Sequence, residues 1–151
     1  AAAVKYSDVL SFNIYDEGLQ THAWSFLHDI DLPSIIGEWH IGAISDSGMF
    51  HPGLVMADSQ EDRAEMYKVY MESVAAHNTM VGAHWFQYID SPVTGRAHDG
   101  ENYNIGFLDV CHRPYAELSD AAITSHEQIY DLATSGIVPY SDVPEYLPKL
   151  F

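Results

Sequence analysis

The chain has 151 residues, 47% of them hydrophobic and 13% aromatic, and its 22 acidic against 6 basic side chains give a formal net charge of −16. This length suffices for one ordinary domain, and the apolar content predicts a packed core, not disorder. The charge excludes nucleic acids and anionic membranes as partners, because binding either needs clustered Lys and Arg. It also disfavours a highly sulfated substrate, so a neutral one fits best; solubility alone explains the charge equally well.

The single cysteine, Cys111, excludes an internal disulfide, and we expect it to be a small buried hydrophobe. No segment reaches the roughly 18 apolar residues of a membrane span. The first residues, Ala1 to Lys5, do not form a signal peptide, so we expect an exported parent protein to carry its signal on a region not present here.

The hydrophobic pattern predicts alternating strands and helices along the chain. We expect strands at 8–15, 33–40 and 80–88, and helices at 20–30, 59–77 and 119–133, the last of which Pro114 opens. Between them we expect a Gly-rich loop at 42–58, a polar loop at 90–104 and an extended segment at 105–110. The tail at 136–151 shows no periodicity.

This order is typical of βαβ units, so the sequence predicts an α/β fold with a parallel sheet. Three strands cannot close a barrel of eight, and an open three-stranded sheet has two exposed edges. We therefore expect the chain to be a single partial domain over residues 1–151, with 136–151 as a tail. Apolar faces left exposed by such a partial fold predict self-association.

The most informative run is the apolar, β-branched segment from Pro33 to His40, which reads as a buried parallel strand and contains Glu38 near its end. A carboxylate at the C-terminal tip of such a strand occupies the position where α/β barrels place their chemistry. The later strand ends in Trp85, Gln87 and Tyr88. Cleavage of a sugar needs a carboxylate that acts at the anomeric carbon, a ring that stacks on the sugar and amides that hold its oxygens. The sequence therefore predicts a sugar-cleaving site.

Two stretches together resemble glycoside hydrolase family 50, the β-agarases: Gly37–Ala43 running on through Gly48–Leu54, and His84–Arg96 continuing through Asp99–Phe107. The similarity covers about Val9 to Ala122. It implies a retaining catalytic domain of the wider clan A with a (β/α)8 TIM barrel fold, of which the three strands are the sixth to eighth, the C-terminal portion. It also implies agarose or a similar neutral galactan as substrate, no cofactor, and a secreted or periplasmic parent protein.

By this resemblance Glu38 matches the nucleophile of the family; pairing with Arg or capping of a loop is the alternative. A retaining mechanism needs a second carboxyl group about 5–5.5 Å away as general acid/base. The family carries it on the fourth strand, which is absent here, so we expect the chain to be inactive without an N-terminal barrel half.

The candidate substrate-binding residues lie at or after the ends of the three strands: Asn13, Tyr15, His40, His84, Trp85, Gln87, Asp90, Arg96, Glu101 and Asn102. Tyr15 would orient Glu38 by a hydrogen bond, or pack at the rim. Trp85 would stack on a pyranose, or belong to the core. Each polar residue after the third strand is equally explained by a loop salt bridge, such as Arg96 with Asp99.

The histidines lack the tight spacing of zinc motifs, so we expect no metal. We predict a cis peptide bond at Trp85–Phe86, next to the site. Two alternative functions stay open: another clan A glycosidase, such as a β-galactosidase, and a non-catalytic or split-barrel carbohydrate-binding fragment.

Overall fold

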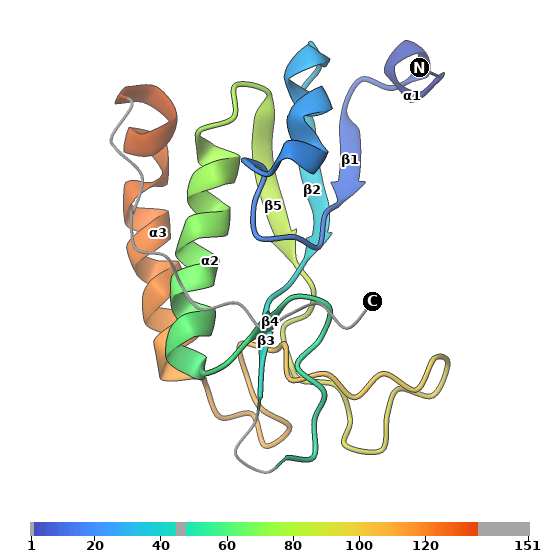
Figure 1. Ribbon diagram of the computed structural model, residues 1–151, viewed down its shortest axis with the longest axis vertical. Helices are drawn as coiled ribbons and strands as arrows, with labels where there is room; N and C mark the ends of the chain where they lie inside the picture. Colours follow the sequence, from blue (N-terminus) through green and yellow to red (C-terminus); the bar gives the residue numbers. More distant parts are fainter. Residues whose placement is uncertain (1, 45–47, 136–151) are drawn as a thin grey trace.

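The structure, a computed structural model, describes residues 2–44 and 48–135 (Figure 1). Its main sheet has three parallel strands in the order β1–β2–β5: β1 at Leu10–Asn13, β2 at Ser34–Trp39 and β5 at Met80–Trp85. A small second sheet pairs β3 at Gly42–Ala43 with β4 at Met56–Ala57, also in parallel. The fold is α/β, as predicted, and all three predicted strands and their parallel pairing are confirmed.

Two long helices, α2 at Gln60–Ala75 and α3 at Ala116–Ser135, pack against each other along one side of the main sheet (Figure 1). A 3₁₀ helix, η1 at His22–Asp29, follows β1, and a short helix, α1 at Ala2–Tyr6, begins the described chain. The three strands run toward one end of the molecule, where the loops after β2 and β5 also gather. That end therefore collects the side chains that follow the strands.

Helix α2 begins at a well-formed cap. The Ser59 side chain accepts a hydrogen bond from the Asp62 backbone N–H at 3.0 Å, and Glu61 and Asp62 place negative charge in the first turn. Both features stabilise a helix N-terminus, the first by satisfying a free N–H group and the second through the helix dipole. The cap fixes where α2 leaves the loop end of the molecule.

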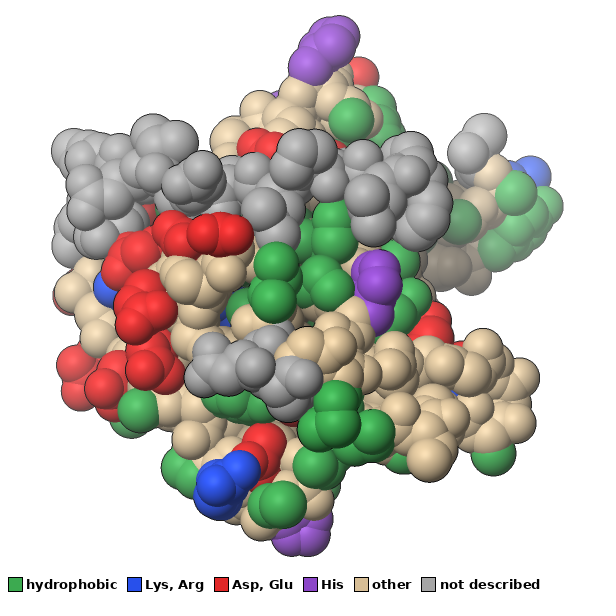
Figure 2. Space-filling model, turned by 60° about the horizontal axis from the view of Figure 1, so that its bottom comes forward, with side chains coloured by type: hydrophobic (Ala, Val, Ile, Leu, Met, Phe, Trp, Pro, Cys, Tyr) green, Lys and Arg blue, Asp and Glu red, His purple; other side chains and the backbone are tan. Residues whose placement is uncertain are grey.

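The core lies between the main sheet and the two helices. Its apolar side chains come from every layer, and those with under 2% exposure include Ile14, Leu27, Ile36, Trp39, Ile41, Met66, Tyr70 and Leu118. Figure 2 looks onto the loop end and shows apolar side chains in its middle, with acidic side chains grouped on the side where Figure 1 places α2 and α3.

The structure corrects several element predictions. Residues 22–29 form a 3₁₀ helix instead of an α-helix, and the Gly-rich loop contains β3 and β4, which the sequence pattern missed because each has only two residues. The segment 105–110 is not a strand; within it only Leu108 forms isolated bridges, to Ile89 and Pro114. The helices predicted at 59–77 and 119–133 are confirmed as α2 and α3. The predicted tail lies outside the described residues.

Cys111 is exposed, so the prediction of a buried cysteine is wrong. It lies in a turn where its backbone N–H donates to Asp109 Oδ1 at 2.8 Å, and this polar loop keeps it at the surface. Among the helices of the described ranges, none is long and apolar enough to cross a membrane.

Candidate functional site

Glu38 leaves the core because β2 contains an irregularity just before it. Ile36 and Trp39 are both buried in the core, yet residues three apart in a regular strand point to opposite faces. The register of the pairing between β2 and β5 shifts between Ile36 and Trp39. In the pairing with β1, the adjacent residues Phe12 and Asn13 pair with Ile36 and Glu38, so one residue of β2 is skipped. One extra residue in β2 thus allows both apolar side chains to face inward, which leaves Glu38 half-exposed at the strand end.

The extra residue occurs where Gly37 meets the first strand. A Cβ atom at this position would lie 2.8 Å from Asn13 Oδ1 and closer still to the Ser11 hydroxyl. Only glycine lets β1 and β2 approach in this way without a shift. The glycine at position 37 therefore permits the irregularity that directs the Glu38 carboxylate away from the core.

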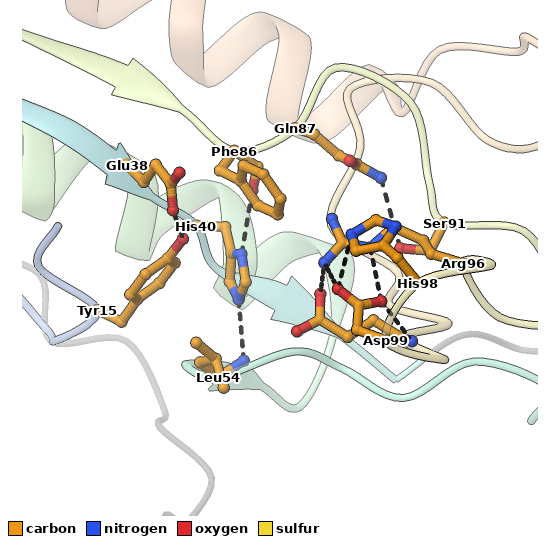
Figure 3. Close-up of polar contacts among 11 residues, drawn as sticks. Tyr15, Glu38, His40, Leu54, Phe86, Gln87, Ser91, Arg96, His98 and Asp99 are labelled. Atoms are coloured by element: carbon orange, nitrogen blue, oxygen red, sulfur yellow. Dashed lines mark hydrogen bonds and ion pairs between the residues drawn. The ribbon is translucent and has the colours of Figure 1, made fainter.

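Tyr15 holds this carboxylate, as predicted from the strand order. Its hydroxyl donates a hydrogen bond to Glu38 Oε2 at 2.8 Å (Figure 3). Burial, together with this hydrogen bond, raises the pKa of the Tyr15 hydroxyl far above its usual range, so the group remains a donor at physiological pH. The Glu38 backbone is also fixed, because its carbonyl accepts the Ile14 N–H at 3.1 Å.

His40, predicted as a substrate-binding residue, is buried and hydrogen-bonded within the protein. The side chain is 2% exposed, and both ring nitrogens are used: Nδ1 bonds the Phe86 carbonyl at 3.0 Å and Nε2 accepts the Leu54 N–H at 2.9 Å (Figure 3). Burial lowers the pKa of His40 to about 3, so the ring is neutral. It ties the end of β5 to the loop before β4 and supports the Tyr15 ring, 4.7 Å away between centroids.

The Trp85 ring, predicted as a sugar-stacking platform, packs against the core and is partly buried. It meets Trp39 edge-on at 4.7 Å between centroids and lies 5.5 Å from both Tyr67 and Phe107. Its indole N–H donates to the Ile105 carbonyl at 2.8 Å. Trp85 is only partly buried, so the ring packs against the core with part of its surface still exposed.

The aromatic ring on the site side is that of the next residue, Phe86. It lies half-buried, 6.2 Å from the His40 ring and 5.1 Å below the Arg96 guanidinium (Figure 3). The cis peptide bond predicted at Trp85–Phe86 instead joins Phe86 and Gln87. Sequence analysis missed Phe86 because alternation along a strand does not say which of two adjacent aromatic residues faces the core.

Asp90, predicted as a substrate-binding residue, lies at the centre of a buried hydrogen-bond network. Its carboxylate accepts hydrogen bonds from the Gly106 N–H, the Asn104 amide and the Tyr115 hydroxyl, each at 2.7 Å. With 5% exposure and three donors already bound, it has no contact left for substrate. Through these hydrogen bonds Asp90 holds the loop after β5 in its folded conformation.

Arg63 extends this network from α2. Its Nε donates to the Ile41 carbonyl and one terminal nitrogen to the Gly106 carbonyl, both at 2.8 Å, so one side chain links the loops after β2 and β5. Burial lowers the pKa of Arg63 to about 10, partly offset by the Asp90 carboxylate. Arg63 is fully buried, because the helix packs its first turns onto the loop end.

Arg96 forms the outer network. It binds Asp99 through two contacts, Nε to Oδ1 at 3.1 Å and a terminal nitrogen to Oδ2 at 2.6 Å, and also donates to the Glu101 carboxylate (Figure 3). The loop salt bridge that was the alternative for Arg96 and Asp99 is thus present. Charges on Arg96 and Glu101 both act on Tyr15, so this cluster borders the Glu38 site.

The remaining predicted residues lie around these groups with few fixed contacts. Asn13 and His84 are exposed on the sheet, Gln87 donates to the Ser91 hydroxyl at 3.4 Å, and Asn102 donates to the Met49 carbonyl at 2.9 Å. Within residues 2–44 and 48–135, no three His, Cys, Asp or Glu side chains are grouped to hold a metal ion.

The site therefore combines a carboxylate held by a phenol, a half-exposed phenyl ring and a charged rim at the C-terminal ends of adjacent parallel strands. Such a carboxylate is placed to act as a nucleophile or a base, and the ring offers an apolar surface to a flat ligand. Tyr103 also borders this group, with its ring 5.9 Å from His40.

Comparison with known proteins shows that the chain is similar to part of the β-agarases. It is 53% identical over 131 residues to β-agarase B of Vibrio sp. (strain JT0107), and 52% identical over 127 residues to β-agarase A of the same strain. These alignments cover 86% and 81% of this chain but 14% and 13% of those proteins. The chain thus spans about a seventh of the length of the curated relatives it matches. No protein-family model matches the sequence.

The backbone agrees with this similarity. A solved exo-β-agarase superimposes with a TM-score of 0.82 at 59% identity, covering 87% of this chain and 18% of that one. In sequence and in fold, the chain is therefore similar to one segment of the β-agarases of glycoside hydrolase family 50.

Proposed function

We propose that this chain is the segment of a β-agarase-like glycoside hydrolase that supplies the catalytic nucleophile, Glu38. The observation that carries the proposal is the 2.8 Å hydrogen bond from Tyr15 to Glu38 at the ends of adjacent parallel strands, in a chain more than half identical to β-agarases. A phenol donor keeps one carboxylate oxygen in place and leaves the other to attack an anomeric carbon.

In the proposed retaining mechanism, Glu38 attacks the anomeric carbon of a β-linked galactose unit while a second carboxyl group protonates the leaving oxygen. Water then releases the sugar from Glu38. We propose that the second group comes from another part of the parent barrel, since the resemblance assigns it to a strand that this chain lacks. The isolated chain is then expected to be inactive.

We further propose that β1, β2 and β5 are consecutive strands of a (β/α)8 barrel, with α2 and α3 on its outside. The three strands are parallel, and the helices lie on one side of the sheet. The opposite face carries exposed side chains such as Ser11, Val81 and His84, and this face would line the barrel interior. Agarose or a similar neutral galactan is the proposed substrate, and a polysaccharide substrate favours a secreted or periplasmic parent.

Phe86 is the proposed aromatic surface for a sugar ring, in place of Trp85. It is the half-exposed ring beside the nucleophile, and sugars stack their apolar faces on aromatic rings. Gln87, His84 and Asn13 remain proposed polar contacts around the same opening.

The test is agarose hydrolysis after mixing this chain with the complementary N-terminal part of a β-agarase barrel. We expect turnover from the mixture and none from either piece. Glu38→Gln is expected to reduce turnover by more than about 10³-fold without changing the circular dichroism spectrum. Glu127→Gln, at an exposed position of α3, is the matched control and should retain full turnover.

The outcomes separate the alternatives. Cleavage of carrageenan-type oligosaccharides in place of agarose would favour another clan A glycosidase. Binding of agaro-oligosaccharides without turnover in any mixture would favour a carbohydrate-binding fragment. Full turnover by the Glu38→Gln variant would contradict the proposed nucleophile.

A further inference from the structure

The cation next to the site is neutralised by its own loop. Arg96 faces Asp99 and Glu101 together, so one positive charge meets two negative ones, and 17% of its side chain is exposed. The two-point contact with Asp99 uses the same donor edge of the guanidinium that would bind a sulfate or a carboxylate. Arg96 therefore lies beside Phe86, the proposed sugar-binding ring, but its donor edge is already bound to the loop carboxylates.

The loop sets this arrangement by its backbone. The Arg96 N–H donates to the Glu101 carbonyl at 2.9 Å, and the Gly100 N–H donates to the Arg96 carbonyl at 2.8 Å. Gly95 and Gly100 have φ values of 85° and 78°, which other residues rarely adopt. The closed turn brings both carboxylates to Arg96 without any ligand.

A continuous series of contacts joins this turn to the nucleophile. The guanidinium lies 5.1 Å above the Phe86 ring, the Phe86 carbonyl binds His40, and the His40 ring lies 4.7 Å from that of Tyr15, which holds Glu38. His40 is neutral and adds no positive charge. An anionic group on a sugar over Phe86 would therefore meet Glu38 on one side and the acidic turn on the other.

Elsewhere in the described residues, the other basic side chains are engaged or distant from this opening. Arg63 is buried on backbone carbonyls, Lys68 pairs with Glu65, Arg113 pairs with Asp109, and Lys5 lies in α1. An anionic substituent thus finds no free cation among them at the site.

We propose that Asp99 and Glu101 act as a charge filter: by binding Arg96 they exclude sulfated or carboxylated sugars from the Phe86 side of the site. The inference rests on the proposed function and deepens it, because it names the residues that set the substrate charge. Removal of either carboxylate would take one negative charge from the turn and leave Arg96 with a single carboxylate partner, so an anionic sugar would be repelled less.

The test compares two probes of equal length on the 151-residue chain, a neutral agarose tetrasaccharide and a sulfated κ-carrageenan tetrasaccharide, by chemical-shift titration of ¹⁵N-labelled protein. We expect the wild type to bind the neutral probe at least about tenfold more tightly. Glu101→Gln should shift this ratio toward the sulfated probe by roughly five- to tenfold, as loss of one nearby charge implies. Asp99→Asn should act in the same direction.

Asp109→Asn is the matched control, because it breaks a loop carboxylate–arginine pair elsewhere, with Arg113. It should leave the ratio unchanged, and added salt should reduce the effect of Glu101→Gln. Equal binding of both probes by the wild type, or an unaltered ratio in both site variants, would overturn the charge filter and leave the proposed function standing. Failure of the wild type to bind the neutral probe at any salt concentration would overturn the filter in this chain, whereas the proposed function is overturned by absence of turnover in the mixture with the N-terminal part of the barrel.

Discussion

Two layers at the loop end of the molecule are built from neighbouring residues yet differ in almost every physical property. The inner layer contains Trp39, Trp85 and Asp90, each closely packed or fully hydrogen-bonded. The outer layer contains Glu38 and Phe86, one residue away along the same strands and half-exposed. The difference teaches that a single position along a strand separates a residue that holds the fold from one that can meet a ligand.

Among substitutions that test the difference between the two layers, Trp85→Ala should have the largest effect on stability. Trp85→Ala should lower the free energy of unfolding by about 4 kcal/mol, because it removes a ring packed against other aromatic rings and leaves a cavity. Phe86→Ala should cost about 1 kcal/mol, since that ring is only half-buried, but should weaken agaro-oligosaccharide binding. Urea denaturation measures the first difference, and equal losses for the two variants would contradict the assignment of layers.

The second comparison is between the buried network around Asp90 and the outer network around Arg96. Asp90→Ala should cost about 3 kcal/mol, because it removes the acceptor of three hydrogen bonds and the negative charge nearest to the buried Arg63. Asp99→Ala, in the outer network, should change stability little, since its partner stays in contact with water and with Glu101. Thermal unfolding of the two variants side by side checks this, and a larger loss for Asp99→Ala would reverse it.

A pH series sharpens the comparison at His40. Its pKa falls from 6.5 in the unfolded chain to about 3 in the fold, so the unfolded state binds the proton first on acidification. The stability that neutral His40 contributes is present above pH 6.5 and is lost as the pH falls toward 3. Between pH 7.5 and 5.0 we expect a loss of about 2 kcal/mol.

The measurement is urea denaturation of the wild type and of His40→Gln at both pH values. The glutamine variant should lack this part of the pH dependence, so the difference between the two proteins isolates it. An identical pH dependence in both would contradict the burial of a neutral ring at this position.

A smaller effect than that of His40 is expected at the hydroxyl groups of Tyr70 and Tyr15. Its hydroxyl donates to the Ile14 carbonyl at 2.8 Å, directly before Tyr15 in the chain. Tyr70→Phe removes one buried hydrogen bond and should cost about 1 kcal/mol in equilibrium unfolding. Tyr15→Phe, where the acceptor is the half-exposed Glu38, should cost less stability and affect turnover in the reconstituted barrel; the opposite pattern would place Tyr15 in the inner layer.

The sequence by itself determined the alternation of strands and helices, the parallel sheet and the position of Glu38 at a strand end. These follow from local periodicity, from the cap at Ser59 and from the order of segments along the chain. The pairing of Tyr15 with Glu38 was also predictable, because both residues come at the ends of strands that are consecutive in the sequence and neighbours in the sheet.

Only the tertiary structure decided which side chains face the site. The irregularity near Gly37 reverses the alternation that would otherwise bury Glu38 with Ile36, and the packing on α2 draws Trp85 inward and leaves Phe86 outward. His40 and Asp90 look like ligands in the sequence, yet long-range hydrogen bonds to the loops bury them. Such contacts join residues 14 to 46 positions apart, and local sequence patterns carry no record of them.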